Sequence, residues 1–155
     1  MSDIPRLSLV EVAARIRDGS LSSASVTAAV LERAHAAEAR IHCFLEIDAD
    51  GAMRAAERAD RARAAGATLG PLHGVPLAHK DMFDIAGERV RYGSRVRGEH
   101  VPTTTATVIE RLDAAGAIRI GVLNMSEFAL GPSGHNASRG DCRNALNPDF
   151  IAGGS

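Results

Sequence analysis

Two short segments of the sequence carry residue types that could exchange a proton. Lys80 is the only lysine among 18 basic residues, and all the others are arginine. A guanidinium keeps its proton in proteins, whereas burial can neutralise an amine, which can then act as a base. The second segment, Gly153-Gly154-Ser155, ends a glycine-rich loop, and paired glycines allow backbone conformations that present a serine hydroxyl closely to a partner. The residues indicate a base and a hydroxyl, although a surface amine and a flexible tail would also fit.

The sequence lacks the motifs of several other kinds of site. It contains no G-x-x-x-x-G-K-[ST] phosphate loop, no G-x-G-x-x-G dinucleotide motif and no H-E-x-x-H zinc motif. None of the six histidines pairs with carboxylates at a metal-binding spacing, so no metal is expected. Neither Ser94 nor Ser133 lies in a G-x-S-x-G nucleophile elbow. Cys43 and Cys142 lack a C-x-x-C spacing, and we expect buried thiols rather than a disulfide or a zinc site.

Composition indicates the broad class of protein. The 155 residues suit about one domain. The balance of 18 basic and 19 acidic residues, with only five aromatic ones, argues against direct nucleic-acid binding. The longest uncharged run, residues 64–79, is broken by glycine and proline and is shorter than the roughly 18 residues of a membrane span. The start, MSDIPRLSLV, lacks the apolar core of a secretory signal. We therefore expect a cytoplasmic protein without a membrane span.

Hydrophobic periodicity predicts a helical first part of the chain. Ser8 and Glu11 form a capping-box pattern for the first helix, which Gly19 would end. Asp48 is placed to cap the third helix. The expected elements are a helix over residues 9–18, a second helix that begins after Ser22 and Ser23 and ends near Arg40, a short buried strand over 41–47, and a helix over 49–65.

The composition changes at Gly66, where glycine, proline and β-branched residues replace alanine and arginine. Residues 74–79 are predicted to form a strand that delivers Lys80 at its carboxyl end, where ligands bind in open α/β sheets. The later elements expected are a helix from Thr103 or Thr104 to 115, a strand over 117–122, a short helix capped by Asn124, and an aperiodic segment over 131–155. Two or three core strands are fewer than the five or six of a typical sheet. We expect an α/β fold with a helical lead-in and an incomplete sheet.

Three blocks follow one another in the second half of the chain: GPLHGVPLAHKD, TATVIERLDAAGAIRIGVLNMSEFALG and NPDFIAGGS. In this order they resemble the amino-terminal part of the amidase signature family, over most of residues 69–155 and more loosely back to about residue 5. The resemblance implies an α/β/α mixed-sheet fold. It also implies one partial domain over 1–155, with the helical lead-in over 1–66 and part of the family core over 67–155.

The same resemblance implies roles for particular residues. Lys80 would be the base, and Ser155 would be the serine that relays a proton and is held by a cis peptide. A second serine would attack the carbonyl of a small-molecule amide, and neither a metal nor an organic cofactor is implied. Ala129, Leu130 and Gly131 would contribute backbone groups to the acyl pocket, although they could also be a plain helix end.

The family's nucleophile and oxyanion loop follow the Gly-Gly-Ser run, beyond residue 155. We therefore expect a fragment of an amidase that is inactive alone, and a homo-oligomer is left open for the full-length protein. Asp81 would satisfy backbone groups after the strand rather than take part in the chemistry, because a carboxylate touching an amine raises its pKa. His79 would either tune Lys80 through charge repulsion or pack as an ordinary histidine.

Two alternatives compete with a stand-alone amidase. The first is the amidase subunit of a glutamine-dependent amidotransferase that acts on mischarged tRNA. Those subunits usually read KDN, NMDEF and GSSTEN, whereas this chain reads KDMF, NMSEF and GPSGHN, which favours the stand-alone enzyme. The second is a non-catalytic interaction module, in which the open edges of an incomplete sheet pair with a complementary chain.

Overall fold

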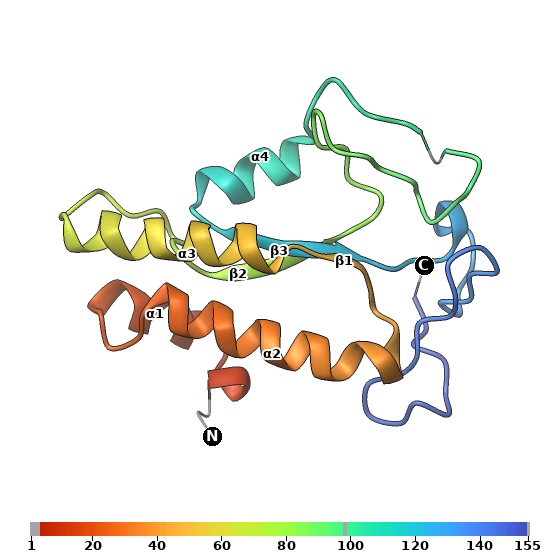
Figure 1. Ribbon diagram of the computed structural model, residues 1–155, viewed down its shortest axis with the longest axis horizontal. Helices are drawn as coiled ribbons and strands as arrows, with labels where there is room; N and C mark the ends of the chain where they lie inside the picture. Colours follow the sequence, from red (N-terminus) through yellow and green to blue (C-terminus); the bar gives the residue numbers. More distant parts are fainter. Residues whose placement is uncertain (1–3, 98, 155) are drawn as a thin grey trace. The chain divides into compact units, whose positions relative to one another are not determined.

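The computed structural model describes residues 4–97 and 99–154. Its 3-10 helices (η), α-helices and strands follow the chain in the order η1 (Ile4–Arg6), α1 (Leu9–Asp18), α2 (Ser23–Ile41), β1 (Phe44–Ile47), α3 (Ala49–Ala64), β2 (Pro76–Lys80), α4 (Thr107–Ala114), β3 (Ile118–Leu123) and η2 (Glu127–Ala129) (Figure 1). The chain divides into two compact units. The first comprises Met1–His35, Asp48–Ala78 and Glu110–Ile120, and the second Ala36–Ile47, His79–Ile109 and Gly121–Ser155.

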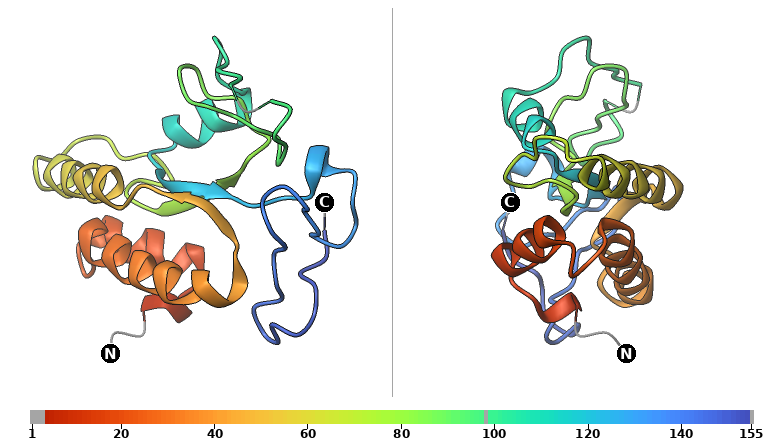
Figure 2. Two further views of the ribbon diagram at one scale, coloured as in Figure 1. Left: turned by 45° about the vertical axis from the view of Figure 1, so that its right-hand side comes forward. Right: turned by 90° about the vertical axis from the view of Figure 1, so that its left-hand side faces the viewer.

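The first unit contains α1 and the beginning of α2, which lie side by side in both views of Figure 2. Local signals set the bounds of α1, which match the prediction. The Ser8 hydroxyl accepts a hydrogen bond from the Glu11 N–H (3.3 Å), and the Glu11 carboxylate accepts one from the Ser8 N–H (2.8 Å). Gly19 ends the helix in the left-handed conformation that glycine adopts without strain. Part of the buried core of this unit is a cluster of Val12, Ile16, Val26 and Val75.

The start of α2 combines a local cap, in which the Ser22 hydroxyl accepts the Ser25 N–H (3.0 Å), with a contact that the local sequence does not reveal. The Asp60 carboxylate, from α3, accepts hydrogen bonds from the N–H groups of Ser23 (2.7 Å) and Ala24 (3.0 Å). The Ser23 hydroxyl instead donates to the carbonyl of Gly74 (2.6 Å). A carboxylate 36 to 37 residues away therefore caps this helix.

Several predicted boundaries are off by one or two residues, as in the strand expected over 74–79, which is β2 at Pro76–Lys80, and three expectations differ more clearly. The strand expected over 41–47 begins only at Phe44, because α2 continues to Ile41 and the Glu38 carboxylate accepts the Phe44 N–H (2.8 Å) after a turn. The helix expected from Thr103 or Thr104 begins at Thr107, because the preceding residues bond the loop at 84–86, with Ala106 N–H donating to the Asp84 carbonyl (2.8 Å).

The third difference is the short helix after β3, which the sequence predicts to be capped by Asn124. Ser126 occupies the N-cap position of η2 instead. The side-chain oxygen of Asn124 accepts the N–H of Met125 (2.8 Å), and its amide reaches other segments of the chain. Asparagine at this position therefore joins loops rather than capping a helix.

The sheet has the order β1-β3-β2 and is mixed. β1 runs antiparallel to β3, pairing Phe44 with Leu123 and Glu46 with Val122. β2 and β3 are parallel, because hydrogen bonds from Ile118 N–H to the Val75 carbonyl (2.8 Å) and from Asp81 N–H to the Leu123 carbonyl (3.1 Å) advance in the same direction. The predicted α/β class with an incomplete sheet is thus confirmed. Among the described residues, no helix has the length and apolar character needed to cross a membrane.

Candidate active site

Lys80 is the last residue of β2 and lies half-buried at the carboxyl end of the parallel pair. Its carbonyl accepts hydrogen bonds from the N–H groups of Met82 (2.7 Å) and Phe83 (3.4 Å), so the chain turns directly after the strand. The next N–H, that of Asp81, is held by Leu123 of β3 (3.1 Å). The backbone of Lys80 is therefore fixed on both sides, at the strand end that the sequence predicted.

The Asp81 carboxylate accepts hydrogen bonds from backbone N–H groups, as expected. Its side chain is only 1% exposed, and its two oxygens accept the N–H groups of Arg91 (3.0 Å) and Gly93 (2.9 Å). Gly93 has a positive φ of 67°, and a Cβ there would lie 3.0 Å from Met125 and Asn136. A side chain would be both strained and crowded at this position. The carboxylate next to Lys80 thus holds a tight loop around Gly93.

The sequence allows two roles for His79, tuning of Lys80 and ordinary packing, and its burial favours ordinary packing. Successive residues of a strand point to opposite faces, so His79 lies on the face of β2 opposite Lys80. It is 8% exposed and lines a cavity of about 210 Å³ with Glu46, Phe83 and Val90 among its other walls. This placement gives no support to direct tuning of Lys80 by His79.

The loop over residues 91–94 forms hydrogen bonds both with the end of β2 and with η2. Asp81 holds two of its N–H groups, and the Tyr92 carbonyl accepts the N–H of Phe128 (2.9 Å). The Ser94 hydroxyl donates to the Glu127 carboxylate (2.6 Å). Tyr92 donates its phenol to Asp84 (2.7 Å), and this bond raises the pKa of Tyr92, which keeps the phenol neutral. One loop therefore connects the neighbours of Lys80 with the neighbours of Ala129.

The predicted acyl-pocket segment begins at the end of η2. Phe128 and Ala129 have positive φ values of 51° and 58°, a conformation that is strained for residues with side chains and that clusters at functional sites. The N–H groups of Ala129 (2.9 Å) and Leu130 (3.2 Å) bond within this turn. Leu130 is 85% exposed, and Gly131 approaches the buried Ser126 hydroxyl. The role of this segment in an acyl pocket remains a prediction.

The segment over residues 131–154 has no regular helix, as its aperiodic sequence predicted. Isolated bridges pair Ser133 with Gly154 and Arg143 with Ile151. Gly153 and Gly154 have positive φ values of 75° and 85°, the conformation expected of the glycine pair. Ser155, the predicted proton relay, lies outside the described residues.

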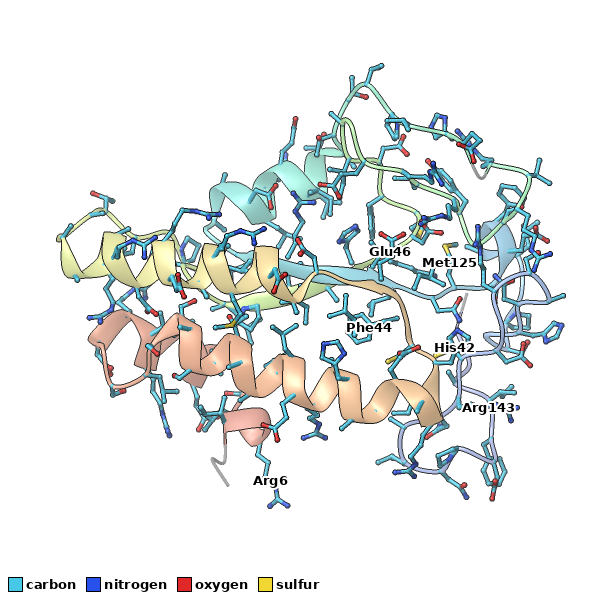
Figure 3. The ribbon with its side chains drawn as sticks, viewed as in Figure 1. Arg6, His42, Phe44, Glu46, Met125 and Arg143 are labelled. Carbon is cyan, nitrogen blue, oxygen red and sulfur yellow. The ribbon has the colours of Figure 1, made fainter. Side chains whose placement is uncertain are left out.

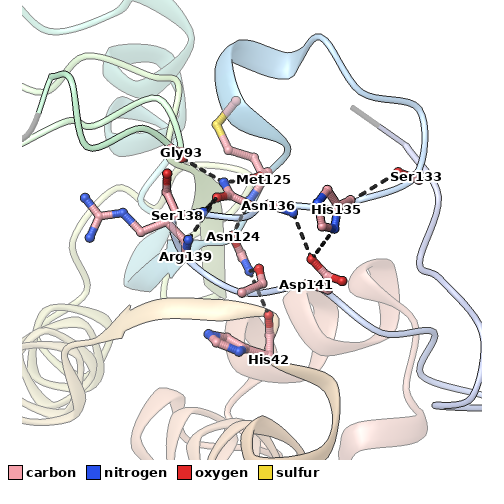
Figure 4. A network of polar contacts seen from close by, with 11 residues as sticks. His42, Gly93, Asn124, Met125, Ser133, His135, Asn136, Ser138, Arg139 and Asp141 are labelled. Carbon is pink, nitrogen blue, oxygen red and sulfur yellow. Dashed lines mark hydrogen bonds and ion pairs between the residues drawn. The ribbon is translucent and has the colours of Figure 1, made fainter.

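Asn136 and Asn124 organise this long loop (Figure 4). The sequence prediction missed Asn136 and assigned Asn124 to a helix cap instead. Asn136 is 2% exposed and donates its amide to the carbonyls of Gly93 (2.7 Å) and Met125 (2.7 Å). Asn124 donates to the carbonyls of His42 (3.2 Å) and Gly140 (3.0 Å). The only signal in the sequence is an asparagine just after a strand and another in an aperiodic loop, which does not reveal the partners.

The second unit also holds a separate group of polar residues. Figure 3 shows His42 and Arg143 on neighbouring segments, where Arg143 N–H donates to the Ile41 carbonyl (2.8 Å). Both residues line a cavity of about 720 Å³, and none of the described site residues Lys80, Ala129, Leu130 and Gly131 does. Cys43 and Cys142 are free thiols, and both are half-buried rather than buried as predicted. Partial burial together with the Glu38 charge raises the pKa of Cys43 to about 11. Within the described residues, no group of three His, Cys, Asp or Glu is arranged to hold a metal.

Comparison with known proteins identifies similar chains. Residues 25–155 match the family model described as Amidase. Over its whole length the chain is 43% identical to the A subunit of glutamyl-tRNA(Gln) amidotransferase from Acidothermus cellulolyticus and 42% identical to the one from Streptomyces coelicolor. In both cases it spans 31% of the relative, so it has about a third of the length of these curated proteins.

Solved structures agree with this similarity. A chain from a vestigial protein complex, linked to the evolutionary origins of an s-triazine catabolic enzyme, is 35% identical with a TM-score of 0.90, over 96% of this chain and 33% of that one. A crystal structure of an amidase is 34% identical with a TM-score of 0.88, over 96% and 34%. Fatty acid amide hydrolase is 27% identical with a TM-score of 0.92, over 98% and 27%. The chain belongs to the amidase signature family.

Proposed function

We propose that this chain supplies the base, Lys80, and the proton relay, Ser155, of an enzyme that hydrolyses a carboxylic amide through an acyl-serine intermediate. The observation that carries the proposal is the family's lysine at a rigid strand end, in a unit that also holds the left-handed glycine pair leading to Ser155. The nucleophile would come from the part of the complete protein that follows this chain.

The proposed proton path accounts for the residue types. The nucleophilic serine oxygen bonds to the carbonyl carbon while its proton passes to the Ser155 oxygen, and the Ser155 proton passes to the Lys80 amine. Lys80 returns a proton along this path to the leaving amine or ammonia as the carbon–nitrogen bond breaks. Water then cleaves the acyl ester. Arginine could not replace Lys80, because it does not give up its proton.

The curated relatives favour a component of an amidotransferase. The similarity to the glutamyl-tRNA(Gln) amidotransferase relative from Acidothermus cellulolyticus extends over the whole chain at 43% identity. We propose that the complete protein releases ammonia from an amide donor for use by a multi-subunit amidotransferase. In that case other protein subunits would be its partners.

A stand-alone amidase is the second candidate, and the motif differences favour it. Ser126 and Met82 stand where the amidotransferase subunits usually carry the aspartate of NMDEF and the asparagine of KDN. Ser126 is 1% exposed, so this difference lies inside the fold rather than on a tolerant surface. The two candidates predict different substrates for the same base and relay.

The test uses the complete protein that contains this sequence. Lys80→Arg keeps the positive charge and removes the ability to act as a base, so amide hydrolysis should fall by roughly 10²- to 10⁴-fold. Arg54→Ala, on the exposed face of α3, is the control and should retain full activity. Turnover by Lys80→Arg within a factor of about three of the parent would reject Lys80 as the base. Activity on simple amides without partners would favour the stand-alone amidase, whereas glutamine hydrolysis that needs other subunits would favour the amidotransferase.

A further inference from the structure

We infer that Asn136 is a positioning residue that holds the loop behind Lys80 in register with the glycine-rich loop leading to Ser155. The inference rests on the proposed function, because it concerns the two residues assigned there as base and relay. Asn136 itself does not need to touch a substrate. It would act through the backbone that carries the two functional side chains.

The side chain of Asn136 is buried and uses both ends of its amide. Its nitrogen donates to the carbonyls of Gly93 and Met125, each at 2.7 Å. Its oxygen accepts the N–H groups of Ser138 (2.8 Å) and Arg139 (2.9 Å). Only an amide offers two donors and an acceptor in this shape. An asparagine at this position therefore cross-links three separate backbone segments.

One branch of this cross-link leads to Lys80. Asn136 holds the Gly93 carbonyl, and the Gly93 N–H is held by Asp81 at 2.9 Å. Asp81 follows Lys80 directly in the chain, and its own N–H is bonded to Leu123 (3.1 Å). Two hydrogen bonds and one peptide bond thus connect Asn136 to the lysine.

The other branch leads toward the glycine pair. The Asn136 N–H donates to the Asp141 carboxylate (3.0 Å), and the N–H of the next residue, Cys142, donates to the Gly134 carbonyl (3.2 Å). The Cys142 carbonyl in turn accepts the Ala152 N–H (3.3 Å). The bridge between Ser133 and Gly154 closes this branch. One residue is therefore linked in both directions, through its buried side chain toward Lys80 and through its backbone N–H toward the glycine pair.

The isosteric variant Asn136→Asp separates this cross-linking from local structure. An aspartate keeps the oxygen that accepts the Ser138 and Arg139 N–H groups, but it faces the Gly93 and Met125 carbonyls with a second acceptor. The bonds that reach toward Lys80 would be lost while the local turn keeps its acceptor. Asn124→Asp is the matched control, because it makes the same change at a buried asparagine whose amide serves His42 and Gly140.

Lys80 supplies its own probe, because it is the only lysine of the chain. Reductive methylation with ¹³C-formaldehyde labels only its amine and the α-amino group. In the NMR spectrum of the 155-residue chain, Asn136→Asp should move both the Lys80 methyl resonance and the Gly154 amide resonance. Asn124→Asp should leave the Lys80 resonance unchanged. A folded Asn136→Asp chain with both signals unmoved, or an equal response to Asn124→Asp, would overturn the inference.

Two further measurements complete the test. If Asn136→Asp does not fold, Asn136→Ser keeps one hydroxyl donor and should give a smaller shift of the same two signals, whereas no shift would reject the link. In the complete enzyme, Asn136→Asp should lower kcat by about tenfold with KM nearly unchanged. The NMR signals do not depend on turnover. A coupled shift in a protein without amidase activity would therefore support the positioning role while rejecting the proposed function.

Discussion

Two buried serines show that the contribution of a hydroxyl to stability depends on whether it has a hydrogen-bond partner. Ser23 is fully buried and donates a hydrogen bond of 2.6 Å to the Gly74 carbonyl. Ser126 is 1% exposed, and its hydroxyl has no hydrogen-bond partner among the described residues. A buried hydroxyl without a partner carries the cost of desolvation and no compensating bond.

Alanine substitutions should therefore have different effects at the two serines. Ser23→Ala leaves a buried carbonyl without its donor and should lower the free energy of unfolding by about 1–3 kcal/mol. Ser126→Ala removes an unpaired hydroxyl together with its desolvation cost and should leave it unchanged or raise it. Urea unfolding of both variants, each followed by circular dichroism, measures the difference. Equal losses at the two positions would contradict the hydrogen-bond assignment.

The residues of the candidate site differ in how far the sequence alone reveals them. Lys80 stands out because its type is unique in the chain and because a strand pattern precedes it. The backbone role of Asp81 also follows from its place at a strand end. Asn136 could not be predicted, because its partners Gly93 and Met125 are 43 and 11 residues away and lie in loops without periodicity.

At the scale of elements, the boundaries that local residues set could be predicted from the sequence. The boundaries that distant contacts set could not. The bounds of α1 follow from the Ser8–Glu11 capping box and Gly19, all within one short segment. The start of α3 likewise follows from Asp48, which accepts the Gly51 N–H (2.9 Å). By contrast, α4 begins late because residues before it bond the loop at 84–86, about 20 residues earlier in the chain.

The capping box of α1 should make stability depend on pH. The hydrogen bond from the Ser8 N–H, followed by that from its hydroxyl, lowers the pKa of Glu11 below its ordinary value. A lowered folded-state pKa stabilises the fold above the unfolded-state pKa, and this contribution is lost as the pH falls through the folded-state value. The parent chain should therefore melt at a higher temperature than Glu11→Gln at pH 7, and the difference should vanish at strongly acidic pH.

Thermal unfolding at several pH values tests this expectation. Glu32→Gln, a similar exchange on the exposed face of α2, serves as the comparison. The difference between Glu11→Gln and the parent chain should shrink on acidification more than the difference for Glu32→Gln. A Glu11→Gln difference that grows as the pH falls would refute the assignment of the capping box as the cause.

At the scale of the whole molecule, several large apolar side chains of the described residues are exposed at one turn near the end of the chain. The turn over residues 144–150 is closed by a hydrogen bond from the Asn144 N–H to the Phe150 carbonyl (3.0 Å). Leu146 is 98% exposed, and Phe150 and Ile151 are 63% and 56% exposed. Soluble monomers rarely leave neighbouring large apolar side chains uncovered. This turn is therefore a surface on which further polypeptide would pack favourably.

The 155-residue chain should self-associate through this turn when it is produced alone. Burial of a leucine side chain contributes about 1.5–3 kcal/mol, so Leu146→Ser should weaken the association constant by about tenfold or more. Sedimentation velocity over a range of concentrations measures it directly. Val96, 86% exposed in another loop, gives the control Val96→Ser, which should leave association unchanged. A chain that stays monomeric at high concentration would contradict association through this turn. Equal weakening by the two variants would show that burial of Leu146 makes no specific contribution to association.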